Sequence, residues 1–128
     1  EIHIGGNDIV RHTDLADVEE DLREVLVMAN TLSDQVILVS CGNVGTSVLF
    51  PYPSRWAFTK RTREVREIFI KLSQELAVDY VDLFHEAAED PFAKDPNKYY
   101  AEDLFHPSDE GYQFWFDQIQ IFYPPKLS

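Results

Sequence analysis

Several features are scarce in this 128-residue sequence, and each scarcity narrows what the chain can do. It has one cysteine, Cys41, so no disulfide can form within the chain. Only 11 Lys and Arg stand against 23 Asp and Glu, and the formal charge of −12 opposes binding to nucleic acid or to an anionic membrane. No apolar run approaches the roughly 18 residues of a membrane-spanning helix. A neutral or cationic small ligand suits this composition, and nothing in it indicates a compartment.

Hydrophobic residues make up 45% of the sequence, which is enough for one core, so we expect a single domain over residues 1–128. Their spacing predicts strands that alternate with amphipathic helices, the pattern of a parallel sheet with helices on both faces. Prolines and glycines favour loops in the segments between them. The expected strands are 1–4, 36–41 and 78–84, the expected helices are 14–30, 59–77 and 108–118, and the expected long loops are 43–58 and 86–102.

The first expected strand, residues 1–4, begins at the first residue with no cap or linker before it. One interpretation is an edge strand near a natural terminus. We favour another, in which N-terminal strands of the same domain are missing from this chain. The exposed edge of a parallel strand offers unpaired backbone groups, so an N-terminal segment would dock there.

In doubly wound folds, ligands bind outside the carboxyl ends of the strands. Polar segments follow the first strand, at 5–8, and the second strand, at Gly42-Asn43, and a third, at 103–108, lies near the end of the chain. Gly5-Gly6-Asn7-Asp8 and Asp103-Leu104-Phe105-His106 resemble, in order and separation, two motif blocks of the SGNH (GDSL-type) hydrolase family. The residues after the second block, Pro107, Ser108, Gly111 and Tyr112, also fit that family. The resemblance extends from Ile2 to about Ile119 and implies an α/β fold, a flavodoxin-like three-layer α/β/α sandwich.

The resemblance also implies roles for individual residues. His106 would be the general base and Asp103 the acceptor that orients it, while Asn7 would donate to the oxyanion. Gly5, Gly6 and Asp8 would shape the turn. Without the resemblance, His106 would be interpreted as a surface histidine and Asp103 as one more solvated carboxylate.

The Gly-Asp-Ser block that supplies the nucleophile in this family is not found in the sequence. The serines are Ser33, Ser40, Ser47, Ser54, Ser73, Ser108 and Ser128. Only Ser47 lies in a suggestive glycine-containing segment, and we interpret it as loop structure. We therefore expect the C-terminal part of an ester or thioester hydrolase whose serine comes from outside this chain, which alone would be inactive. The alternative is a non-catalytic α/β binding module that has lost the nucleophile.

Other features have two interpretations each. The aromatic residues Phe50, Tyr52, Trp56 and Phe58 suit either an acyl or alcohol pocket or core packing. The oxygen-bearing residues Asp90, Asp95, Asn97 and Glu102 lack EF-hand spacing, and we interpret them as a solvated acidic loop. We expect no metal and no organic cofactor. The substrate would be a small ester or an acylated carbohydrate, and the sequence does not distinguish these.

Overall fold

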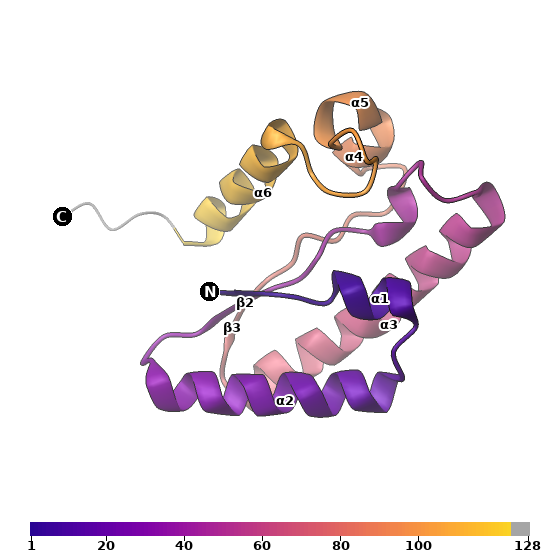
Figure 1. The fold of residues 1–128 in the computed structure, drawn as a ribbon. Helices are drawn as coiled ribbons and strands as arrows, with labels where there is room; N and C mark the ends of the chain where they lie inside the picture. The colour runs from indigo at the N-terminus through magenta and orange to yellow at the C-terminus, as the bar shows by residue number, and fades with distance from the viewer. Residues whose placement is uncertain (124–128) are drawn as a thin grey trace.

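The computed structural model describes residues 1–123 and has a mixed α/β architecture (Figure 1). Residues 124–128, which the prediction of one domain over 1–128 includes, lie outside the described part. In chain order the elements are β1 (Ile2–His3), α1 (Gly6–Arg11), α2 (Leu15–Leu32), β2 (Ile37–Val39), the 3₁₀ helix η1 (Val44–Thr46), α3 (Tyr52–Glu75), β3 (Asp79–Val81), α4 (Pro91–Lys94), α5 (Pro96–Tyr99) and α6 (Asp109–Phe122).

The three strands form a parallel sheet in the order β1-β2-β3. Ile2 pairs with Leu38, and Val39 pairs with Val81. The prediction of parallel strands is confirmed, although each strand is shorter than expected. Within residues 1–123, β1 pairs with β2 alone, so its other edge carries no strand.

One face of the sheet is covered by α2 and α3, which run side by side along it (Figure 1). The side chains that repeat at three- and four-residue spacing on these helices form the main core with β2. This core includes Val18, Leu22, Leu26, Leu38, Val65, Phe69 and Leu72. Asp14 caps α2 by accepting a hydrogen bond from the Ala16 amide at 2.8 Å. Val25, whose three-residue spacing from Leu22 suits the inner face of α2, is instead exposed.

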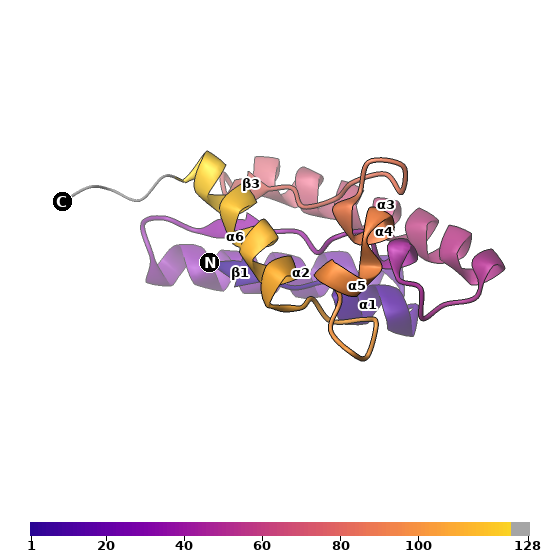
Figure 2. The ribbon, with the colours of Figure 1, turned by 90° about the horizontal axis from the view of Figure 1, so that it is seen from above.

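Helix α6 covers the other face of the sheet, as the view from above shows (Figure 2). Trp115 and Ile119 pack there against a second apolar cluster of Val39, Val81 and Leu83. The helix begins where expected because the Ser108 hydroxyl accepts a hydrogen bond from the Gly111 amide. Helices on both faces agree with the alternation read from the sequence.

The predictions of long loops at 43–58 and 86–102 were wrong in part, for the same physical reason. Helix α3 begins at Tyr52 and not at Thr59, and α4 and α5 occupy part of the expected acidic loop. Each of these helices has a proline in its first turn, where no backbone amide is needed for the helix ladder. The acidic side chains of Asp90 and Asp95 cap α4 and α5.

The glycine segment after β1 also differs from the expected open turn, because Gly6–Arg11 forms α1. Gly5 has a φ of 112°, and a Cβ there would lie 2.9 Å from the Phe69 ring. A Cβ at Gly6 would meet no atom within 4 Å. Of the two glycines, only Gly5 is therefore required by the shape of this segment. Asp8 lies in the first turn of α1.

Candidate active site

A cavity of about 510 Å³ lies at the carboxyl end of the sheet. Its wall contains Gly5 and Asn7 from the segment after β1, Gly42 from the segment after β2, and His106 from the loop before α6. The polar segments singled out in the sequence thus meet around one space. The volume falls within the range of small-molecule binding sites.

Asp103 and His106 form a direct side-chain pair. The Nδ1 atom of His106 lies 2.5 Å from Oδ2 of Asp103. The other carboxylate oxygen, Oδ1, accepts the backbone amides of Phe105 at 3.0 Å and His106 at 2.9 Å. One carboxylate therefore sets both the shape of the loop and the direction of the imidazole, which explains the three-residue spacing of the two side chains.

These hydrogen bonds also fix the protonation of the pair. The His106 ring and the amides of Phe105 and His106 lower the pKa of Asp103 to about 2, so its carboxylate is ionised at neutral pH. An ionised carboxylate only accepts, and the proton of a neutral imidazole therefore sits on Nδ1. The Nε2 atom is left as the acceptor, which is the tautomer that a general base requires.

The loop that carries the pair closes on itself. The Ala101 amide donates to the His106 carbonyl at 2.8 Å, and the Leu104 amide donates to the Ala101 carbonyl at 2.9 Å. Leu104 adopts a φ of 58°, a left-handed conformation that is rare for a side chain of this size. The side chains of Asp103 and His106 are nonetheless open to solvent, with 51% and 66% of their surface exposed.

Asn7 lies on the exposed side of α1 and lines the cavity, while Asp8 beside it is half-buried. Among the described residues no hydrogen bond occupies the Asn7 amide, so its two N–H groups are available to a ligand. The arrangement brings Asn7 and His106 to the same cavity. The role of each side chain in a reaction stays a prediction.

No serine of the described chain is joined to His106 by a hydrogen bond, and Ser128 lies outside that part. Ser47 lines the cavity but is buried, with 1% of its surface exposed, and its hydroxyl donates to the Leu104 carbonyl at 2.5 Å. Cys41 also lines the cavity. Burial raises the pKa of its thiol to about 12, so Cys41 is a thiol and not a nucleophilic thiolate at neutral pH.

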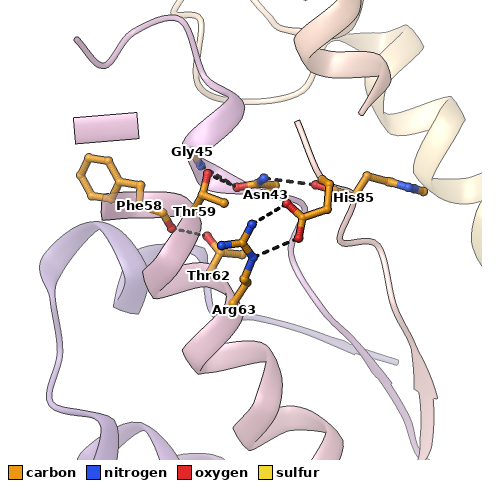
Figure 3. A network of polar contacts seen from close by, with 8 residues as sticks. Asn43, Gly45, Phe58, Thr59, Thr62, Arg63 and His85 are labelled. Carbon is orange, nitrogen blue, oxygen red and sulfur yellow. Dashed lines mark hydrogen bonds and ion pairs between the residues drawn. The ribbon is translucent and has the colours of Figure 1, made fainter. Parts of the chain in front are cut away.

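Sequence reasoning did not predict the polar network of Asn43, a residue that lines the cavity (Figure 3). Asn43 is 3% exposed; its Oδ1 accepts the Gly45 amide at 3.0 Å and the Thr59 hydroxyl at 3.1 Å, and its Nδ2 donates to the His85 carbonyl at 3.1 Å. This single side chain connects η1 with α3 and with the segment after β3. Its place directly after Gly42, at the end of a strand, was the one signal that pointed to it.

The cavity wall is rich in aromatic side chains, but they are not those of the expected aromatic loop. Its aromatic residues are Phe92, Tyr100, Phe105, Tyr112, Phe114 and Trp115. Phe50, Tyr52, Trp56 and Phe58 do not line it; Phe50 and Phe58 pack together, whereas Tyr52 and Trp56 are 85% and 69% exposed. The carboxyl groups on the wall are those of Asp8 and Asp90, and burial raises the pKa of Asp90. No Lys or Arg of residues 1–123 lines the cavity.

Within residues 1–123, no helix has both the length and the apolar character needed to cross a bilayer. The same residues contain no group of three or more His, Cys, Asp or Glu side chains that could hold a metal ion.

Comparison with known proteins supports the resemblance read from the motifs. Residues 2–114 match the model of a family described as GDSL-like lipase/acylhydrolase. No curated protein and no solved structure gave a significant match. The matched region contains all the residues that carry the resemblance to SGNH hydrolases, from Gly5 to His106.

Proposed function

Because the chain belongs to the GDSL-like lipase/acylhydrolase family, we propose that it supplies the acid–base part of a serine ester hydrolase site. The observation that carries this proposal is the Asp103–His106 pair, which leaves Nε2 of His106 free. His106 and Asn7 line the same cavity. In the proposed site His106 is the general base, Asp103 orients it, and Asn7 donates to the oxyanion. Gly5, the glycine that the shape of the segment requires, and Asp8 in the first turn of α1 support the presentation of Asn7.

The reaction follows from these roles. His106 Nε2 takes the proton from a serine hydroxyl as the serine oxygen bonds to the ester carbonyl carbon. The carbonyl oxygen becomes negative and accepts a hydrogen bond from the Asn7 amide. When the intermediate collapses, the imidazolium returns the proton to the departing alcohol, and water then cleaves the acyl-serine by the same steps. Since the pKa of Asp103 is about 2, its carboxylate stays ionised in mild acid and keeps its contact with the His106 ring.

The serine in this proposal comes from outside residues 1–128. An N-terminal segment of the same protein would carry it in a Gly-Asp-Ser block and add strands beside β1, completing a three-layer α/β/α sandwich. Two observations support this arrangement: the outer edge of β1 is unpaired within residues 1–123, and both side chains of the Asp–His pair are exposed. The chain by itself would then be inactive.

The charges around the cavity favour one group of esters. A ligand that enters it meets aromatic faces and two carboxyl groups, with no Lys or Arg from the described residues to pair with a carboxylate or phosphate. Apolar, hydroxyl-bearing and cationic groups all suit such a wall. The proposed substrates are therefore small esters or acylated carbohydrates that carry no negative charge in the part that enters the cavity.

Denaturing intact-mass spectrometry, before and after exposure to a fluorophosphonate that labels activated serines, tests the proposal. We expect the purified protein to include a serine-bearing segment that gains the adduct, and His106→Ala to prevent the labelling. If only the 128-residue chain is present and it stays unlabelled, the proposal of a two-part site fails. The non-catalytic binding module then becomes the better description.

A further inference from the structure

Residues from outside the loop help to hold the loop that carries Asp103 and His106. Its middle residue, Leu104, is in the left-handed region at a φ of 58°, which an exposed loop would not keep without support. The hydrogen bonds within the loop use the Leu104 amide but leave its carbonyl free for an outside donor. The residue that supports Leu104 from outside is thus of interest for the proposed site.

That support comes from Ser47, which is 57 residues earlier in the chain. The Ser47 hydroxyl accepts the Leu49 amide at 3.2 Å and donates to the Leu104 carbonyl at 2.5 Å. Because the Ser47 oxygen accepts a hydrogen bond from the Leu49 amide, the single hydroxyl proton is directed to the Leu104 carbonyl. The hydroxyl is buried, so water cannot replace this bond easily.

A second contact from the neighbouring residue holds the start of the same loop. The Thr46 hydroxyl donates to the Asn43 carbonyl at 2.8 Å, so in its 2.9 Å contact with Tyr100 it must be the acceptor. Burial raises the pKa of Tyr100 to about 12, which keeps the phenolic proton available for this bond. Tyr100 also pairs with Pro107 in an antiparallel bridge. Two consecutive hydroxyls therefore hold the loop at two points.

The segment that carries these hydroxyls is itself rigidly attached to the core. A Cβ on Gly45 would lie 2.4 Å from the Arg55 carbonyl oxygen and 2.0 Å from the Thr59 hydroxyl, so η1 packs directly against α3. The hydrogen bonds of Asn43 join it to α3 and to the segment after β3 (Figure 3). The hydroxyls of Thr46 and Ser47 thus start from a fixed position.

We propose that Ser47 is a positioning residue of the ester hydrolase site: its hydroxyl holds the Leu104 carbonyl and thereby keeps the His106 ring in register with Asp103 and the cavity. This inference rests on the proposed function for its catalytic consequence. Its structural part concerns the tautomer of His106 and can be measured without any substrate.

The first measurement is long-range ¹H–¹⁵N NMR of the histidine rings in the 128-residue chain, at a pH where His106 is neutral. The chain has four histidines, and the spectrum of His106→Ala identifies the signals of His106 while the others serve as internal references. In the unmodified chain we expect the proton on Nδ1. In Ser47→Ala we expect a mixture of Nδ1–H and Nε2–H forms, because the loop no longer holds the ring against Asp103.

The matched control is Ser40→Ala. The Ser40 hydroxyl is also buried, with 3% of the residue exposed, and it accepts the Leu83 amide at 2.8 Å, but it makes no contact with the loop. We expect Ser40→Ala to lower thermal stability as Ser47→Ala does, without altering the His106 signals. Unchanged His106 signals in Ser47→Ala, or equal changes in both variants, would overturn the inference.

A second variant, at Leu104, tests the same link by another route. Leu104→Gly adopts a positive φ without steric cost, so it should fold and reduce the need for the Ser47 hydrogen bond. In the protein that carries the nucleophile, we expect Ser47→Ala to lower kcat about tenfold with little change in KM, and by less in the Leu104→Gly background. Equal losses in both backgrounds would contradict the proposal.

These readouts separate the two proposals. If the tautomer changes in Ser47→Ala only, while no ester is hydrolysed by any form of the protein, the positioning role stands and the hydrolase proposal fails. If esters are hydrolysed and neither the His106 tautomer nor kcat changes in Ser47→Ala, the hydrolase proposal stands and the positioning role fails.

Discussion

Helix α3 belongs to the main core, and the loop of residues 101–106 lies at the cavity. Different kinds of contact position the two. Helix α3 is held by buried apolar side chains such as Val65, Phe69 and Leu72, which pack against α2 and the sheet. The loop has exposed Asp103 and His106 side chains, and polar contacts from Ser47 and from its own backbone hold it. Apolar burial thus fixes where the scaffold lies, and directed hydrogen bonds fix how the Asp103 and His106 side chains point.

The largest expected effect comes from removing an apolar side chain from the core between α2, α3 and the sheet. Leu72 is 0% exposed, and Leu72→Ala should lower the free energy of unfolding by about 2–5 kcal/mol because it leaves a cavity in the core. Leu32→Ala is the matched control, since Leu32 is 81% exposed and should cost under about 0.5 kcal/mol. Urea denaturation followed by circular dichroism measures both. Equal losses would show that the α2–α3 face does not provide the stability.

The next effect concerns the site and should leave stability unchanged. Asn7→Ala in the active protein should lower turnover by roughly 10²–10³, or about 2.7–4 kcal/mol, because it removes the proposed oxyanion donor. Substrate binding should change far less, and unfolding should be unaffected because Asn7 is exposed. Asn97→Ala, an exposed asparagine outside the cavity, is the control. Equal losses in turnover and in binding would rule out the oxyanion role.

The smallest effect concerns a polar contact on the scaffold face. The Asp14 side chain caps α2, and Asp14→Ala should lower the free energy of unfolding by about 1 kcal/mol without changing turnover. Asp17→Ala, in the first turn of the same helix, removes a charge but not the cap. Thermal unfolding compares the two variants. If Asp17→Ala destabilises the protein as much as Asp14→Ala, charge near the helix terminus is responsible and not the capping bond.

The sequence was most informative where short-range chemistry determines the structure. The spacing of Leu22, Leu26 and Leu72 predicted the inner faces of α2 and α3, and the Asp103-x-x-His106 spacing predicted a pair that one turn can form. Prolines misled the prediction of α3, α4 and α5, because a proline that ends one helix is equally acceptable in the first turn of another.

The residues that the sequence did not reveal act across long separations. Asn43 bonds to His85, and Ser47 bonds to Leu104, 42 and 57 residues away. Neither contact has a local pattern, since an asparagine after a glycine or a serine near one is typical of any turn. The spacing of the last helix does not show which aromatic residues line the cavity, and only the fold places Trp115 over Gly42.

The double use of the Asp103 carboxylate ties the shape of the loop to the orientation of the His106 ring. Since one oxygen shapes the loop and the other engages the imidazole, the two functions cannot be tuned separately by substitution at this position. The loop closes between Ala101 and His106, and contacts from outside reach it at Tyr100, Leu104 and Phe105. A protein engineer who grafts it onto another sheet therefore has to supply two buried hydroxyls and an aromatic partner together with the loop.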